Sequence, residues 1–254
     1  STLDRSSAAS DVYKRQLVYV VDNTMTSPYL FQPKSVGASL IINSLTKYIG
    51  GHGNVLGGAV TETGLYDWSV FPNIYPEYQL GEATKWGITQ TRKKGLRDLG
   101  ASLGPEAAHH VAIGAETLAL RVQRQSENAM AMCEFLHAYP KIKKVYYPGL
   151  AEHPQHARAG ELFRAFGGLF SFELQSDVDL WEFLNRLQVI VKSSNLGDNR
   201  TLSIPVAHTI YFEMGPERRA SMGIDESLIR ISSGIEDSED LLADLSAALN
   251  KGGL

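Results

Sequence analysis

Residues 40–50 read LIINSLTKYIG, and this stretch decides how the chain is interpreted. Leu40-Ile41-Ile42 is a short apolar run of the kind that forms a buried strand. Hydroxyl side chains follow at Ser44 and Thr46, and a single lysine, Lys47, comes directly after them. A lysine behind a strand is usually a solvated surface residue. Whether Lys47 has a functional role therefore depends on which other residues lie near it in the fold.

A second apolar run lies upstream, at residues 17–21, and ends in turn-forming residues that begin with Asp22. The connection between the two runs is long enough for a right-handed crossover, which predicts that the two strands pair in parallel. Parallel neighbours bring their carboxyl ends to one edge of a sheet, where open α/β sheets bind ligands. We therefore expect Asp22 and the segment 44–47 to share that edge.

Composition narrows the possible functions. The chain has 254 residues, is 43% hydrophobic and carries a formal net charge of −4, and its basic residues form no stripe that would favour a nucleic-acid partner. A single cysteine, Cys133, excludes an intrachain disulfide framework and a cysteine-based zinc site. No apolar run reaches the length of a membrane span and no signal-peptide core is visible, so a cytoplasmic protein without a membrane partner is predicted.

The pattern of elements predicts three parts. Residues 1–16 are small and polar and are predicted to be a disordered or non-native tail, residues 17–118 part of a large α/β domain, and residues 119–254 an α+β domain. A third strand is expected near residues 55–60. Apolar residues spaced by three and four predict one long helix from Pro105 to just before Pro140. In the last part we predict strands at 168–173 and 228–232, a helix at 180–187, and a final helix capped by residues 238–240.

Several motifs together resemble a known family. They read DNT at 22–24, SLTKYIGGHG at 44–53 and LIRISSGIED at 228–237, with support from YPGL at 147–150 and NLGD at 195–198. This combination resembles the fold-type I, pyridoxal phosphate (PLP)-dependent enzymes of cysteine and methionine metabolism. The group includes cystathionine γ-synthase, the O-acylhomoserine sulfhydrylases, methionine γ-lyase and the cystathionine lyases. The similarity extends from about residue 17 to the C-terminus.

The resemblance implies a role for each matching residue. Lys47 would hold PLP as a Schiff base and then act as the base for the substrate Cα proton. Asp22 would pair with the pyridinium nitrogen and keep it protonated. Ser44 and Thr46 would donate hydrogen bonds to the cofactor phosphate. Arg230 would bind the substrate α-carboxylate through two parallel hydrogen bonds, with help from Asn195.

The same resemblance implies the fold and the reaction. We expect a partial fold-type I large domain with a mainly parallel sheet, followed by the α+β domain, and a chain that corresponds to such an enzyme without its N-terminal part. The expected activity is γ-replacement or γ-elimination on homoserine esters or sulfur amino acids, as in cystathionine γ-synthase. The longer form is expected to be a homodimer or homotetramer.

Two alternatives stay open. Within the family, the chain could be a methionine γ-lyase or a cystathionine lyase. In a different class, it could be an inactive fragment that contributes only oligomer surface.

Other candidate residues receive structural interpretations. The glycines at 50–58 precede a strand rather than opening a helix, which is unlike a nucleotide-binding loop. His52 is expected to make a structural hydrogen bond. Cys133 falls on the apolar face of the predicted long helix and is expected to be a core residue. His109 and His110 are adjacent and point to different faces of that helix, so no metal site is predicted.

Overall fold

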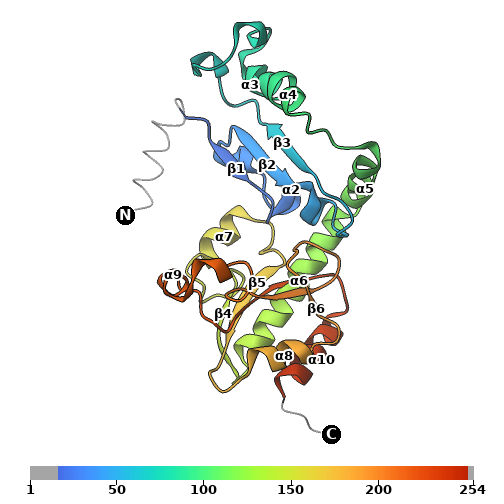
Figure 1. The fold of residues 1–254 in the computed structure, drawn as a ribbon, viewed down its shortest axis with the longest axis vertical. Helices are drawn as coiled ribbons and strands as arrows, with labels where there is room; N and C mark the ends of the chain where they lie inside the picture. The colour runs from blue at the N-terminus through green and yellow to red at the C-terminus, as the bar shows by residue number, and fades with distance from the viewer. Residues whose placement is uncertain (1–16, 251–254) are drawn as a thin grey trace.

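The computed structural model describes residues 17–250 and contains two sheets. The first has the order β1-β2-β3, from β1 (Val20–Asp22), β2 (Leu40–Ser44) and β3 (Gly58–Glu62). The second has the order β4-β5-β8-β7-β6. Figure 1 shows the first sheet toward one end of the molecule and the second toward the other, with α5 and α6 running beside both.

The first sheet is mixed. β1 and β2 pair in parallel, with Val20 opposite Leu40, which confirms the predicted parallel pairing. β3 pairs antiparallel with β2, so the described sheet has one pairing of each kind rather than a mainly parallel arrangement. The 13 residues between β2 and β3, 45–57, begin with the turn that carries Lys47 and contain no α-helix that could carry the chain across the sheet, so β3 returns alongside β2 in the opposite direction.

The second sheet combines five strands: β4 (Ile142–Tyr146), β5 (Leu169–Leu174), β6 (Val191–Lys192), β7 (Leu202–Pro205) and β8 (Leu228–Ser232). All its pairings are antiparallel except that of β6 with β7. β8, which carries Arg230, lies at the centre of this sheet between β5 and β7.

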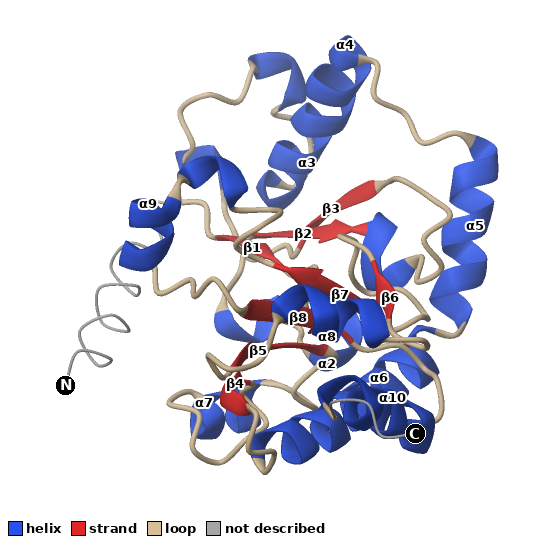
Figure 2. Cartoon of the chain, turned by 60° about the horizontal axis from the view of Figure 1, so that its bottom comes forward, coloured by secondary structure: helices blue, strands red, loops and turns tan. Residues whose placement is uncertain are grey.

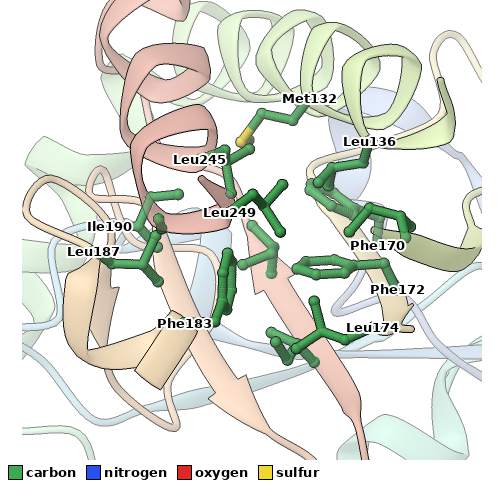
Figure 3. Packing of buried hydrophobic residues seen from close by; sticks show 14 of the residues in the cluster. Met132, Leu136, Phe170, Phe172, Leu174, Phe183, Leu187, Ile190, Leu245 and Leu249 are labelled. Atoms are coloured by element: carbon green, nitrogen blue, oxygen red, sulfur yellow. The ribbon is translucent and has the colours of Figure 1, made fainter. Parts of the chain in front are cut away.

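Helices pack around these sheets (Figure 2). Their bounds are α2 (Ser27–Leu30), α3 (Trp86–Gln90), α4 (Arg97–Leu99), α5 (Pro105–Glu116), α6 (Leu118–His137), α7 (His156–Leu162), α8 (Leu180–Arg186), α9 (Pro216–Ser221) and α10 (Ser238–Leu249). The main core joins α6, α8 and α10 to the second sheet. In Figure 3, Met132 and Leu136 of α6 point toward Leu245 and Leu249 of α10, with Phe172 of β5 beneath them.

The predicted long helix is wrong in one respect, because it is two helices. α5 ends at Glu116 and α6 begins at Leu118, and Thr117 between them has φ −103° and ψ 5°. At this break, Nη2 of Arg121 donates a hydrogen bond to the carbonyl of Gly114. The periodicity of apolar residues continues across the break, so the pattern alone could not reveal it.

Smaller differences concern the ends of elements. The first strand begins at Val20 rather than Leu17, and the third runs over Gly58–Glu62 rather than 55–60. The last helix is capped by Asp237, whose carboxylate accepts a hydrogen bond from the Glu239 N–H, rather than by residues 238–240. The predicted tail at 1–16 lies outside the described residues. The proposed boundary between residues 118 and 119 stays a prediction.

Candidate active site

The carboxyl ends of β1 and β2 meet at one edge of the first sheet, as the sequence predicted. The hydroxyl Oγ1 of Thr24 accepts a hydrogen bond from the Ser44 N–H at 2.8 Å. The Asn23 N–H donates to the Ile42 carbonyl at 2.7 Å. Asp22 is exposed beside this junction, and its Oδ1 accepts from the Thr24 N–H at 3.0 Å. Through these hydrogen bonds, Thr24 of the DNT motif connects the carboxylate of Asp22 to Ser44, where the segment that carries Lys47 begins.

Lys47 lies in a single π-helical turn, Leu45–Ile49, that begins where β2 ends. Its own φ of −90° and ψ of −126° are not helical, so the turn is interrupted at the lysine. The hydroxyl of Thr46 is engaged with the backbone of Gly57: it accepts from the Gly57 N–H at 3.0 Å and donates to the Gly57 carbonyl at 3.3 Å. That second bond is long, so the hydroxyl proton can be redirected to a stronger acceptor.

The amine of Lys47 meets a residue from the other end of the chain. Its Nζ donates to Oδ1 of Asn195 at 2.6 Å. Both residues line an open depression of about 380 Å³, together with Thr46 and residues 53–56. Asp22, Ser44 and Arg230 do not line that depression. The carboxamide that accepts from the lysine directs its NH₂ group elsewhere, which leaves two donors available to a ligand.

Arg230 reaches the same loop from β8. Its Nη2 donates to the carbonyls of Ser194 at 2.9 Å and Asn195 at 3.2 Å. Its Nε is buried and has no hydrogen-bond partner among the described residues. A buried donor without a partner is costly, and a carboxylate would satisfy it while matching the planar guanidinium.

Electrostatics distinguish Lys47 from a surface lysine. Partial burial lowers the pKa of its amine, and the positive charge of Arg230 lowers that pKa further. The neighbouring Tyr48 is fully buried, and burial raises the pKa of its phenol to about 12. Lys47 is thus easier to deprotonate than an ordinary lysine, while Tyr48 stays neutral at physiological pH.

The loop that carries Asn195 fits closely against the lysine turn. Gly197 has φ +73°, and a Cβ atom there would lie 2.7 Å from the backbone N of Tyr48. The Gly197 N–H donates to Oγ of Ser232 at 2.8 Å, which ties the loop to β8 as well. The glycine in NLGD is therefore required both by its backbone conformation and by the absence of a side chain.

Sequence reasoning missed a polar stripe on α6. Arg121, Gln125 and Asn128 are all buried, at 4%, 0% and 1% exposure. Arg121 donates to carbonyls of the lysine turn, Gln125 to the Asp198 carbonyl, and Asn128 to the Gly234 carbonyl. The signal was present, since these residues recur at the same spacing of four and three as the apolar face.

His52 and Cys133 behave as expected. His52 makes a structural hydrogen bond between Nδ1 and the Gly50 carbonyl at 2.7 Å. Cys133 is fully buried in the main core, and burial raises the pKa of its thiol. Within residues 17–250, no group of three or more His, Cys, Asp or Glu side chains is placed to hold a metal ion. No helix in that range is long and apolar enough to cross a membrane.

These residues fit a bound phosphorylated aldehyde and an amino acid. An amine with a lowered pKa, hydroxyls at Ser44 and Thr46 and a carboxylate at Asp22 gather near one sheet edge. The unpartnered Nε of Arg230 offers a site for a carboxylate. The donor set therefore matches the chemical groups of a phosphorylated aldehyde and of a carboxylate.

Comparison with known proteins identifies the family. A family model described as Cys/Met metabolism PLP-dependent enzyme matches residues 1–250, and the chain belongs to that family. O-acetyl-L-homoserine sulfhydrylase 1 of Thermus thermophilus is 37% identical over 97% of this chain and 62% of its own length. An L-methionine gamma-lyase of Fusobacterium nucleatum is 37% identical over 91% of this chain and 54% of its own. The chain thus spans between 54% and 62% of the length of these relatives.

A solved structure confirms the fold. A protein of Campylobacter jejuni, described as an O-acetylhomoserine (thiol)-lyase, superimposes with a TM-score of 0.85 at 33% identity, over 96% of this chain and 61% of that protein. That structure carries N'-pyridoxyl-lysine-5'-monophosphate. The α/β fold of PLP-dependent fold-type I enzymes, present here as part of the large domain with a further α+β region, is therefore confirmed.

Proposed function

We propose that this chain provides the cofactor-linking and carboxylate-binding part of a PLP-dependent transsulfuration enzyme. Its reaction would be γ-replacement or γ-elimination on homoserine esters or sulfur amino acids, as in cystathionine γ-synthase. The observation that carries this proposal is the contact of 2.6 Å between Lys47 Nζ and Asn195 Oδ1, on a loop whose backbone Arg230 also binds. An amine with a lowered pKa beside a carboxamide whose loop is bound by an arginine supports this proposal.

Each residue then has a defined task. Lys47 would attach to the cofactor and later move the substrate's Cα proton, for which a lowered pKa is an advantage near neutral pH. Asp22 would hold a proton on the ring nitrogen, while Ser44 and Thr46 would bind the phosphate. When bound, PLP supplies an electron sink for the charge that develops at Cα. Arg230 and Asn195 would orient the substrate through its carboxylate.

The test begins with cofactor attachment. The chain is incubated with PLP, reduced with borohydride and digested, and the modified peptide is located by mass spectrometry. We expect stoichiometric labelling at Lys47, a visible absorbance band that disappears in Lys47→Ala, and full labelling in the control Lys34→Ala, which alters an exposed lysine. Equal spectra for wild type and Lys47→Ala would overturn the assignment.

The substrate is tested by product analysis. O-acetylhomoserine, O-succinylhomoserine, cystathionine and methionine are supplied separately, with and without a thiol. Replacement products support the proposed synthase or sulfhydrylase type of reaction. Release of an α-keto acid from methionine or cystathionine would instead support the alternative, a methionine γ-lyase or a cystathionine lyase.

A second candidate is a chain that has no activity and contributes only oligomer surface. It is favoured by the first sheet, where Val20, Ile42 and Val60 are apolar and each about 40–45% exposed. Ile42 and Val60 are paired neighbours on adjacent strands. Tight stoichiometric PLP binding in a titration would contradict this candidate.

Assembly and location complete the proposal. The longer form is proposed to be a homodimer or homotetramer in the cytoplasm, acting on a small amino-acid substrate without a nucleic-acid or membrane partner. Light scattering coupled to size-exclusion chromatography measures the mass of the assembly directly. A monomer at micromolar concentration, with cofactor bound, would contradict the oligomer.

A further inference from the structure

The turn that carries Lys47 ends with carbonyls that the turn itself does not satisfy. Within it, the Gly50 N–H donates to the Leu45 carbonyl at 2.8 Å and the Gly51 N–H donates to the Lys47 carbonyl at 2.7 Å. The carbonyls of Tyr48 and Ile49 instead receive hydrogen bonds from a side chain of α6. The end of the lysine turn is therefore held by another element.

That side chain is Arg121. Its Nη1 donates to the Tyr48 carbonyl at 2.8 Å, and its Nη2 donates to the Ile49 carbonyl at 3.2 Å and the Gly114 carbonyl at 2.6 Å. Its Nε donates to Thr117 Oγ1 at 3.0 Å, which fixes the plane of the guanidinium. One side chain thus joins the end of the lysine turn to the end of α5.

The charge of Arg121 makes this arrangement unusual. Among the ion pairs of residues 17–250, none includes Arg121, although its side chain is buried. Burial lowers the pKa of its guanidinium because the cation has lost water. A buried cation without a countercharge is costly, and an apolar side chain would fill the space at less cost. Its hydrogen bonds to carbonyls are the compensation the structure provides.

Two glycines make room for this contact. Gly51 has φ +69°, and a Cβ atom there would lie 2.0 Å from Arg121 Nη1. A Cβ atom at Gly114 would lie 2.2 Å from the Gly50 carbonyl oxygen. The lysine turn and the end of α5 can approach the guanidinium only because neither position has a side chain.

We propose that Arg121 is a positioning residue for Lys47, which clamps the end of the lysine turn and so keeps the amine in contact with Asn195. The consequence for catalysis rests on the function proposed above. The clamp itself is a property of the chain without cofactor, so it is tested independently of PLP binding.

The experiment compares Arg121→Met and Arg121→Lys with the control Arg124→Met. Arg124 lies one turn further along α6 and contacts Glu236 and Asp237 rather than the lysine turn. Hydrogen exchange is measured by mass spectrometry on the peptide that spans the lysine turn and on a peptide from α10. The pH dependence of Lys47 acylation is measured in the same samples.

In Arg121→Met we expect exchange at Gly50 and Gly51 to rise roughly tenfold or more, since hydrogen bonds from a charged donor are lost. Exchange in α10 should not change, and the midpoint for acylation of Lys47 should move to higher pH as the amine becomes more solvated. In Arg121→Lys, both the exchange rate and the acylation midpoint should lie between those of Arg121→Met and wild type, because one ammonium can bind only some of the carbonyls. Arg124→Met should match wild type in both measurements.

Unchanged exchange and acylation in Arg121→Met would overturn the proposal, and so would a uniform loss of protection that includes α10. If Arg121→Met does not fold, Thr117→Val provides the second test. That variant removes the acceptor for Nε and leaves the arginine in place, so a smaller rise in exchange confined to the lysine turn is expected. Exchange equal to wild type in Thr117→Val would then overturn the proposal.

Discussion

Lys47 Nζ and Asn195 Oδ1 lie 2.6 Å apart although 148 residues separate them in the chain. The lysine belongs to a turn at the edge of the first sheet, and the asparagine belongs to a loop beside the second. Neither sheet alone contains the candidate site. The contact exists only because the two loops meet beside α6.

The pKa of Lys47 should respond to Arg230. We expect Arg230→Gln to raise the pKa of the amine toward that of an ordinary lysine, because a nearby positive charge is removed. The pKa should not return fully to that of an ordinary lysine, since burial lowers it more than Arg230 does. The pH midpoint for acylation of Lys47, followed by mass spectrometry, measures the change. A midpoint that moves to lower pH would contradict the assignment, and Arg124→Gln serves as the control.

The same lowered pKa predicts how stability depends on pH. The folded state holds the Lys47 proton less tightly than the unfolded state, whose lysine pKa is about 10.4. Between the lowered value and about 10.4, unfolding takes up a proton, so the free energy of unfolding should rise with pH. Denaturation at several pH values should show this slope, and Lys47→Met should reduce it. An equal slope in the variant would rule out Lys47 as its source.

Replacing Arg230 by lysine should weaken substrate binding in a catalytically competent form. Lysine keeps the charge but cannot form two parallel hydrogen bonds with a carboxylate. We expect kcat/KM to fall by roughly 10- to 150-fold, which corresponds to about 1.5–3 kcal/mol for a charged hydrogen-bonded pair. Steady-state kinetics would check this, with Arg218→Lys on exposed α9 as the control. Wild-type kinetics in Arg230→Lys would remove Arg230 from the site.

Gly197 should tolerate no side chain. In Gly197→Ala, the positive φ and the contact with Tyr48 both oppose the new Cβ atom, and we expect a loss of about 1–3 kcal/mol beyond the backbone cost. Gly223→Ala is the matched control, because Gly223 has φ +71° with no atom within 4 Å of the added Cβ. It should lose only the backbone cost of about 1–2 kcal/mol. Chemical denaturation gives both values, and equal losses would show that the contact with Tyr48 is not restrictive.

The main core gives a prediction for stability. Leu136→Ala empties a fully buried position on α6 and should reduce the free energy of unfolding by about 2–5 kcal/mol. Leu120→Ala on the same helix changes a side chain that is 75% exposed, so its effect should stay within about 0.5 kcal/mol. Urea denaturation distinguishes the two. Similar losses at both positions would contradict the packing seen in Figure 3.

Local patterns predicted much of the fold. The parallel pairing of β1 and β2 followed from two apolar runs and the length between them, and β8 was predicted with its observed bounds, Leu228–Ser232. The break at Thr117 was not predicted, because the apolar periodicity continues across it; in the structure the Gly114 carbonyl next to the break receives a hydrogen bond from Arg121. The direction of β3 was not predicted either, because the 13 residues before it are long enough for parallel or antiparallel pairing.

The sequence proposed a set of residues for the candidate site but gave no information on its geometry. The motifs named Lys47, Asp22, Ser44, Thr46, Asn195 and Arg230. They gave no sign that Asn195 Oδ1 contacts the lysine amine, or that Thr46 is engaged with Gly57. Arg121 was overlooked because an arginine in a helix is usually solvated. Its burial depends on carbonyls more than seventy residues away along the chain.

The polar stripe of α6 has a consequence for how such a protein can diverge. Arg121, Gln125 and Asn128 hold three loops through backbone carbonyls, which are the same in every amino acid. Apart from the glycines at 51 and 197, whose positions leave no room for a side chain, side chains on those loops can therefore be exchanged while the main-chain positions are kept. A scaffold anchored in this way keeps the backbone around Lys47 in place while many of the surrounding side chains vary.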